Sequence, residues 1–184
     1  MVVSGSALVH MDAKGEPRLG VDFGRVIHGG AVEDGEEDED TVFLSGDMAA
    51  AMSSPATEGV YEAMPRLVER FAGQAWIISK CGERTEEKTR RWLDRHRFYD
   101  RTGLPRGNVR FCRRRADKAV ICAELGITHM IDDRLDVHLA IRELVPNRYL
   151  FGPQRGPVPD WVTHVRTWAE AERMVTAGTT KPRP

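Results

Sequence analysis

Short apolar runs alternate with longer amphipathic segments along most of the chain. Five runs have the length and the apolar character of buried strands: residues 18–23, 75–79, 108–112, 128–132 and 147–151. Four segments between them carry apolar residues at helical spacing: residues 57–71, 83–97, 116–125 and 135–144. Strands that are joined through helices lie parallel and connect by right-handed crossovers. The pattern therefore predicts an α/β fold, a Rossmann-like doubly wound sheet of about five parallel strands with helices on both faces.

The length of 184 residues suits one sizeable core and is short for two ordinary enzyme domains. We expect a single domain over residues 18–175, with loose tails at residues 1–17 and 176–184, because both ends lack periodicity. Residues 27–56 separate the first strand from the first helix, and we expect a small flap there with no large cap domain. Within this flap, residues 33–40 are almost all acidic, which indicates a solvated acidic loop.

The composition adds limits on partners and location. The apolar fraction of 41% and charged fraction of 30% are ordinary for a globular protein, and a net charge of -1 argues against a globally basic nucleic-acid binder. No apolar run is long enough to span a membrane, and no basic segment precedes an apolar run at the N-terminus. We therefore expect a cytoplasmic protein with no membrane partner. Three cysteines without close spacing indicate reduced thiols and no structural metal.

Polar residues stand at the ends of the predicted strands, which is where ligands bind in an open parallel sheet. Asp22 ends the first strand, Ser79 the second, and Asp132 and Asp133 the fourth, while Lys118 opens the helix before the fourth strand. This set is coherent as a phosphoryl-transfer site. A carboxylate can attack phosphorus, hard carboxylate oxygens suit Mg²⁺, and an ammonium and a hydroxyl can hold the phosphoryl oxygens.

The order Asp22, Ser79, Lys118, Asp132 and Asp133 resembles the four sequence motifs of the haloacid dehalogenase-like superfamily, and the resemblance covers nearly the whole folded unit. It implies that Asp22 is the nucleophile, that Ser79 and Lys118 are phosphate ligands, and that Asp132 and Asp133 are metal ligands, so that Mg²⁺ is the expected cofactor. For Asp22 and Asp133 a structural role stays open. Asp22 would then cap a turn, and Asp133 would serve only as the N-cap of the helix that begins near residue 135, which leaves Asp132 as the safer metal ligand.

The sequence departs from the superfamily's pattern at Gly24. Phosphatases of the superfamily place a second Asp two residues after the nucleophile, as general acid and base, and here that position is Gly24. Residues 20–24, 79–82 and 131–136 resemble a capless or small-flap branch of the superfamily that lacks this second Asp. We keep Gly24 among the expected metal-site residues.

Without a general acid, a leaving alkoxide departs unassisted and the rate falls by a factor of roughly 10²–10⁴. His28 is a candidate substitute, because an imidazole titrates near neutral pH, and Arg25 is an electrostatic candidate.

We expect the substrate to be held by a set of mostly cationic side chains, namely Ser79, Lys80, Lys118, Arg25, His28 and Arg113. Arg113 belongs to a local basic cluster, residues 110–115, that would attract an anionic substrate or a nucleic-acid phosphate. Charge runs are more often solvated loops, and few aromatic residues interleave with this one.

Three functional hypotheses remain open on the sequence alone. The first is a Mg²⁺-dependent hydrolase of the haloacid dehalogenase-like type, a phosphatase that forms an aspartyl-phosphate on Asp22 with a small or macromolecular phosphorylated substrate. The second is a catalytically degenerate module that binds Mg²⁺ and a phosphorylated ligand or partner, and Gly24 is its main support. The third is a carbon–phosphorus or carbon–halogen hydrolase, which requires a substrate-specific base that the sequence does not reveal.

Overall fold

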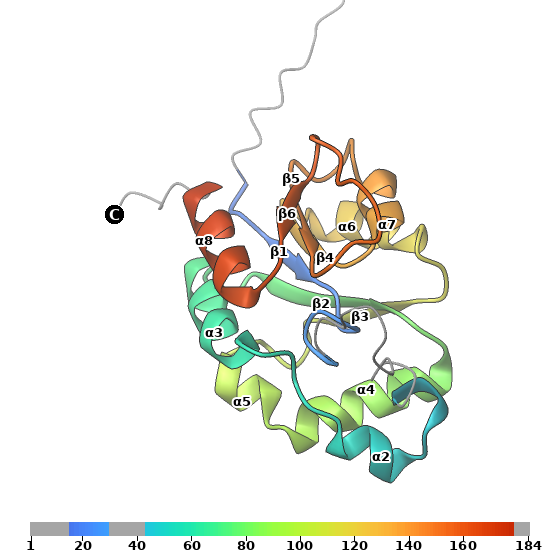
Figure 1. Ribbon diagram of the computed structural model, residues 1–184. Helices are drawn as coiled ribbons and strands as arrows, with labels where there is room; N and C mark the ends of the chain where they lie inside the picture. The colour runs from blue at the N-terminus through green and yellow to red at the C-terminus, as the bar shows by residue number, and fades with distance from the viewer. Residues whose placement is uncertain (1–14, 30–42, 179–184) are drawn as a thin grey trace, which may run out of the picture.

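A parallel six-stranded sheet in the order β3-β2-β1-β4-β5-β6 forms the centre of the molecule (Figure 1). The computed structural model describes residues 15–29 and 43–178. The strands are β1 (Leu19–Val21), β2 (Ala75–Lys80), β3 (Val109–Cys112), β4 (His129–Asp132), β5 (Asn147–Phe151) and β6 (Thr163–Val165). The prediction of a Rossmann-like α/β fold is confirmed, and each predicted run overlaps one strand. The sequence pattern did not reveal β6, because this strand has three residues and only Val165 is buried.

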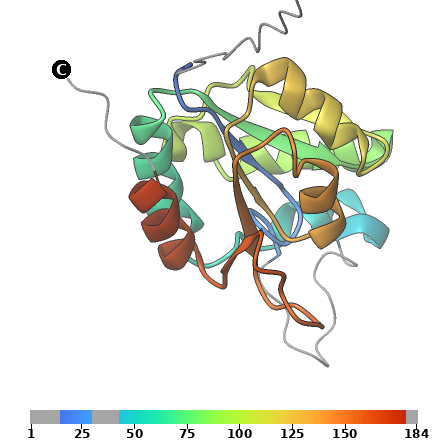
Figure 2. The same cartoon turned by 90° about the horizontal axis from the view of Figure 1, so that it is seen from above.

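Helices cover both faces of the sheet, as expected for a doubly wound fold. One face carries α3 (Val60–Arg70), α4 (Glu83–Arg95), α5 (Phe98–Thr102) and α8 (Trp168–Gly178), and the other carries α6 (Asp117–Leu125) and α7 (Leu135–Ala140). Figure 2 shows α3 and α8 on the opposite side of the strands from α6 and α7. The short α2 (Met48–Ser53) packs beside α4.

Several helix limits differ from the predicted ones. Helices α2, α5 and α8 lie outside the four predicted segments, α7 ends at Ala140, and α8 extends past residue 175 to Gly178. Helix α8 was recognisable in principle, since its buried residues Trp168, Ala171 and Val175 recur at helical spacing. None of the described helices is long and apolar enough to cross a membrane.

Side chains that alternate along the strands build two cores. Val21, Ile77 and Ile131 belong to the larger core under α3, α4, α5 and α8. The adjacent strand residues, such as Ile78 and Met130, point to the opposite face and belong to the smaller core under α6 and α7. A Cβ at Gly20, on the central strand β1, would lie 2.6 Å from the Met130 sulfur, so a side chain there would force Met130 to move. This close packing fixes the ends of β1 and β4 beside each other.

The described parts of the flap at residues 27–56 are tied to the domain. The ammonium of Lys88, on α4, is 1% exposed and donates to the carbonyl oxygens of Phe43, Leu44 and Gly46 at 2.8, 3.2 and 2.7 Å. These bonds hold residues 43–46 against α4. The predicted acidic loop at residues 33–40 lies outside the described residues, as do residues 1–14 and 179–184 of the predicted tails at residues 1–17 and 176–184.

One buried histidine makes the stability of the fold depend on pH. His129 packs against the rings of Phe71 and Tyr149, and burial lowers its pKa from 6.5 to about 4. As the pH falls below 6.5, His129 gains a proton in the unfolded chain but not in the folded chain. Its contribution to the free energy of unfolding is therefore fully present above pH 6.5 and is lost progressively as the pH falls to about 4. The loss from this group is at most about 3 kcal/mol.

We predict that His129→Phe reduces the slope of stability against pH in this window, because phenylalanine keeps the ring packing but cannot bind a proton. Urea unfolding at a series of pH values measures it. Phe71→Leu is the control: it disturbs the same cluster and should lower stability by a similar amount at every pH. An unchanged slope in His129→Phe would contradict the assignment.

Candidate active site

Most of the expected site residues meet at the carboxyl edge of the sheet, between β1 and β4, where the order of the strands reverses. Open α/β sheets bind ligands at such a switch point. A cavity of about 410 Å³ opens at this edge. Most of the expected residues line it, namely Asp22, Gly24, Arg25, Ser79, Lys80, Lys118 and Asp133. The sequence prediction therefore located the cavity.

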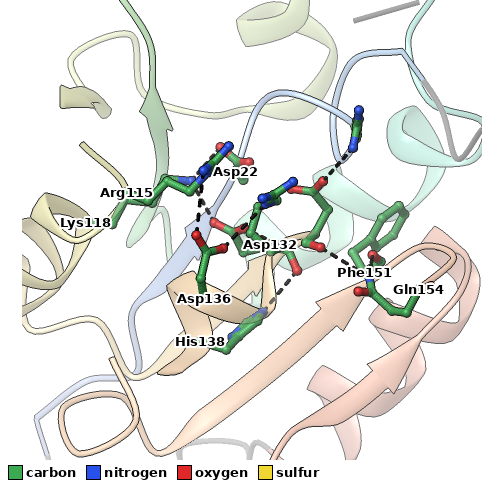
Figure 3. A network of polar contacts seen from close by, with 11 residues as sticks. Asp22, Arg115, Lys118, Asp132, Asp136, His138, Phe151 and Gln154 are labelled. Carbon is green, nitrogen blue, oxygen red and sulfur yellow. Dashed lines mark hydrogen bonds and ion pairs between the residues drawn. The ribbon is translucent and has the colours of Figure 1, made fainter. Parts of the chain in front are cut away.

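Lys118 connects the two strand ends at the base of the cavity (Figure 3). Its Nζ lies 2.8 Å from Asp22 Oδ1 and 2.7 Å from Asp132 Oδ2, and its side chain is 2% exposed. Burial opposes the charged form, but the carboxylates of Asp132 and Asp22 outweigh it and raise the pKa of Lys118 above its ordinary value. Lys118 therefore remains a cation at any physiological pH and holds both carboxylates in place.

Three carboxyl groups crowd around this ammonium. Asp22, Asp132 and Asp133 each offer an oxygen within 4.8 Å of the others. Burial, and then the charge of Asp132, raises the pKa of Asp22 to about 6 despite the opposing effect of Lys118. Burial, together with the charges of Asp22 and Asp132, raises the pKa of Asp133 to about 8.

This crowding is what a divalent cation would relieve. Among the described residues, the cations paired with these carboxylates are Lys118 and, at 3.9 Å from Asp133, Arg25, so the carboxylates outnumber them. The donors are hard oxygens on a rigid sheet edge, the kind of ligand that Mg²⁺ takes from proteins. The residues present therefore fit a bound Mg²⁺.

Asp132 and Asp133 have different positions. The carboxylate of Asp132 is fully buried and accepts from Lys118 and from the backbone N–H of Arg134 at 2.9 Å, while its backbone oxygen accepts from His138 at 3.0 Å. Asp133 lines the cavity, and Gln154 donates to its backbone oxygen at 3.2 Å (Figure 3). The N-cap alternative for Asp133 is wrong, because Arg134 is the N-cap residue of α7 and no side chain caps this helix.

His28 is not at the cavity, which corrects the expectation that it contacts substrate or acts as an acid. Its side chain is fully buried and contacts the rings of Phe23, Phe43 and Trp92, and its Nε2 lies 2.6 Å from Ser54 Oγ. The reason is a tight turn after β1, in which the N–H groups of residues 27 and 28 both donate to the carbonyl of Phe23. This turn directs His28 into the core.

Arg113 does not line the cavity either. It donates to the backbone oxygen of Cys81 at 2.7 Å and pairs with Glu86 at 3.2 Å, so it fixes the connection between β2 and α4.

Most of the basic cluster at residues 110–115 is already paired. Besides Arg113, Arg114 pairs with Asp117 at 2.8 Å and Arg115 with Asp136 at 3.7 Å, while Arg110 donates to the backbone oxygen of Gly107 at 2.7 Å. This arrangement gives no support to a nucleic-acid interface. Arg115 does line the cavity.

The cavity contains further residues that the sequence reasoning did not select. Arg134 lines it directly after the Asp pair, and its Nε lies 3.5 Å from Asp136. Thr85 and Thr89 line it from one face of α4. They are four residues apart in the helix that follows Ser79, so the sequence could have placed both on one helix face near the site. Phe43 and Leu44 also line it, but they follow the acidic segment with no periodicity that would have identified them.

Comparison with known proteins relates the chain to solved structures. No protein-family model matches it, and no curated protein sequence gives a significant match. The crystal structure of D,D-heptose 1,7-bisphosphate phosphatase from B. bronchiseptica, complexed with magnesium and phosphate, matches with a TM-score of 0.61 and 13% identity over 88% of this chain and 99% of that chain. The HAD domain of effector protein Lem4 from Legionella pneumophila matches with a TM-score of 0.45 and 10% identity over 88% and 93%. At such identities the likeness concerns the fold.

The raised pKa values predict a proton-coupled metal site. Asp133, with a pKa of about 8, is mostly protonated at neutral pH, and its carboxyl must lose this proton to ligate Mg²⁺. We expect Mg²⁺ affinity to rise as the pH increases toward 8, with release of about one proton per ion near neutral pH. Calorimetry in buffers of different ionisation enthalpy measures the number released. Asp133→Asn should bind Mg²⁺ more weakly and release fewer protons, and equal proton release by the two proteins would refute the role of Asp133.

Proposed function

We propose that this chain, which has the fold of the haloacid dehalogenase-like superfamily, is a Mg²⁺-dependent phosphatase that forms an aspartyl-phosphate on Asp22. The observation that carries the proposal is the buried arrangement of Asp22, Asp132 and Asp133 around Lys118 at the switch point of the sheet. A structural role alone does not require three carboxyl groups with oxygens within 4.8 Å of one another and an adjoining cavity. Strongly perturbed titratable groups in a cleft are typical of catalytic sites.

In the first half-reaction the Asp22 carboxylate attacks phosphorus. The bond from phosphorus to the ester oxygen breaks, and its electron pair leaves with that oxygen as the alkoxide or phenoxide. Lys118, 2.8 Å from Asp22, and the Ser79 hydroxyl at the cavity wall would bind the phosphoryl oxygens. Asp22, Asp132 and Asp133, with Gly24, would hold Mg²⁺, which when bound offsets the repulsion between the carboxylate and the phosphate.

In the second half-reaction a water molecule attacks the phosphorus of the aspartyl-phosphate. The bond between phosphorus and the Asp22 oxygen breaks, the carboxylate is regenerated, and inorganic phosphate leaves. Lys118 remains charged throughout, because Asp132 stabilises it independently of Asp22. The cationic side chains of Arg25, Arg115 and Arg134 along the cavity would attract the anionic substrate.

Among residues 15–29 and 43–178, no side chain occupies the position of the superfamily's general acid. Gly24 occupies the position of the superfamily's general acid, and His28 is buried among aromatic rings. The proposed enzyme therefore favours esters whose leaving group departs without protonation. The same observation favours a second candidate function, a module that binds Mg²⁺ and a phosphorylated ligand without turnover.

The first test is phosphate release from an activated aryl phosphate. We expect release that requires Mg²⁺, stops with EDTA, and falls by at least about 10³-fold in Asp22→Asn, because the amide is not a nucleophile. Asp94, on α4, is an exposed carboxylate that pairs with Arg106. The variant Asp94→Asn is the control and should leave the rate unchanged. Folded wild-type protein that binds Mg²⁺ but releases no phosphate from this ester would reject the phosphatase in favour of the binding module.

A second test restores the absent acid. Gly24→Asp should raise the rate on alkyl phosphates, which need protonation of the leaving oxygen, by roughly 10²–10⁴ relative to the rate on the aryl ester. Steady-state kcat/KM for the two ester classes provides the ratio. Gly24→Asn has nearly the same shape without an acidic proton, so an equal gain in that variant would show that proton donation is not the cause.

A further inference from the structure

Two arginines from different segments line the cavity and share one carboxylate. Arg115 precedes α6 and Arg134 precedes α7, and both belong to the cavity lining. Their guanidinium nitrogens lie 3.7 and 3.5 Å from the two carboxylate oxygens of Asp136, and their side chains are 44% and 42% exposed (Figure 3). Because a single carboxylate offsets only one of the two guanidinium charges, this group of three side chains leaves a net positive charge at the cavity.

Hydrogen bonds fix the backbone of both arginines to the base of the cavity. The N–H of Arg134 donates to Asp132 Oδ1 at 2.9 Å. The carbonyl oxygen of Arg115 accepts from the N–H of Lys118 at 3.1 Å. Both side chains therefore begin one hydrogen bond away from residues of the proposed phosphoryl-transfer site, and they line the same cavity as Asp22.

The neighbouring arginines that do not line the cavity are bound more closely. Arg114 pairs with Asp117 at 2.8 Å, and Arg113 donates to the backbone oxygen of Cys81 at 2.7 Å. Charge-assisted hydrogen bonds have lengths of about 2.7–2.9 Å, so the contacts of the two cavity arginines with Asp136 are long and weak. A guanidinium group has several N–H donors, and Asp136 contacts one nitrogen of each arginine. Most of their donor capacity is therefore available to an anion in the cavity.

The chemistry of the leaving group decides what such arginines can do. An alkoxide needs a proton as it departs, and arginine cannot supply one because its pKa lies above about 12. A departing phosphate needs no proton at neutral pH, since the second pKa of a phosphate monoester is about 6. Arginine binds the oxygens of such an anion through two parallel N–H bonds. Because Gly24 provides no general acid, the cavity suits a leaving group that is itself a phosphate.

We infer that the substrate is a phosphoanhydride and that Arg115 and Arg134 are catalytic residues that bind the leaving phosphate. This inference rests on the proposed function and names its substrate class. The Asp22 carboxylate attacks the terminal phosphorus of a diphosphate, the bond from this phosphorus to the bridging oxygen breaks, and the electron pair leaves with that oxygen on the inner phosphate. Water then hydrolyses the aspartyl-phosphate. The products are a phosphate monoester and HPO₄²⁻, and one proton from the water passes to solvent.

The test compares kcat/KM for methyl diphosphate, methyl phosphate and para-nitrophenyl phosphate in the presence of Mg²⁺. Wild-type protein should hydrolyse methyl diphosphate at least about 10²-fold faster than methyl phosphate, whose leaving alkoxide needs a proton. Arg115→Gln and Arg134→Gln should each lower kcat/KM for methyl diphosphate by roughly 10- to 100-fold more than for the nitrophenyl ester, the value of hydrogen bonds to a charged group. Lysine at either position keeps the charge without the planar pair of donors and should give an intermediate ratio.

Arg110→Gln is the matched control. It removes the same charge from the same basic cluster, but Arg110 does not line the cavity, so the ratio for the two substrates should not change. Equal losses on both substrates in the cavity variants, or the same change of ratio in the control, would overturn the inference. Hydrolysis of the nitrophenyl ester that requires Asp22, without hydrolysis of methyl diphosphate, would reject this inference and leave the phosphatase proposal intact. Hydrolysis of neither compound by folded protein that binds Mg²⁺ would overturn both.

Discussion

The rest of the site depends on the two ion pairs that the buried ammonium of Lys118 makes. It lies between Asp22, after the first strand, and Asp132, at the end of the fourth, and it is almost completely buried. Loss of one partner from a buried ion pair costs about 3–5 kcal/mol, because the other charge remains without compensation. A lysine near a helix N-terminus also opposes the helix dipole. The two carboxylates offset this cost, and the strand order that puts β1 beside β4 brings them together.

The three carboxyl groups of the site carry more negative charge than the cations paired with them neutralise. Among the described residues, Lys118 and Arg25 are the cations paired with these three carboxyl groups, and burial raises the pKa values of Asp22 and Asp133. Binding of a divalent cation would relieve this conflict and favour the ionised form of Asp22 that a nucleophile needs. His138 and Gln154 support the arrangement from behind, through the backbone oxygens of Asp132 and Asp133.

The wall of the cavity along α4 has a different character from its base. Lys88 uses its charge to secure the backbone of residues 43–46, so an ammonium here serves to position an uncharged wall. Thr85 and Thr89 also line the cavity from α4. The cavity thus has a charged base, formed by Lys118 and the carboxyl groups, and an uncharged wall along α4.

Residues at strand ends were predictable from sequence, and residues placed by turns and loops were not. Asp22, Ser79 and Asp133 follow continuous apolar runs, and the parallel topology then puts them at one edge. His28 was misplaced because a hydrogen-bonded turn, which leaves no periodic signal, rotates it into the core. The pairing of Arg113 with Glu86 joins two elements whose relative position the pattern does not specify. Phe43 and Leu44 reach the cavity through the Lys88 anchor, a contact across more than forty residues.

The most direct test of the account is to find the phosphoryl group on Asp22. Protein with Mg²⁺ and an activated aryl phosphate would be quenched rapidly in acid, digested, and analysed by peptide mass spectrometry. The account predicts a phosphoryl group, labile at alkaline pH, on the peptide that contains Asp22, and none in the Asp22→Asn protein. Release of inorganic phosphate by the enzyme with no phosphoryl group on this residue at any quench time, or with the group on another residue, would contradict it.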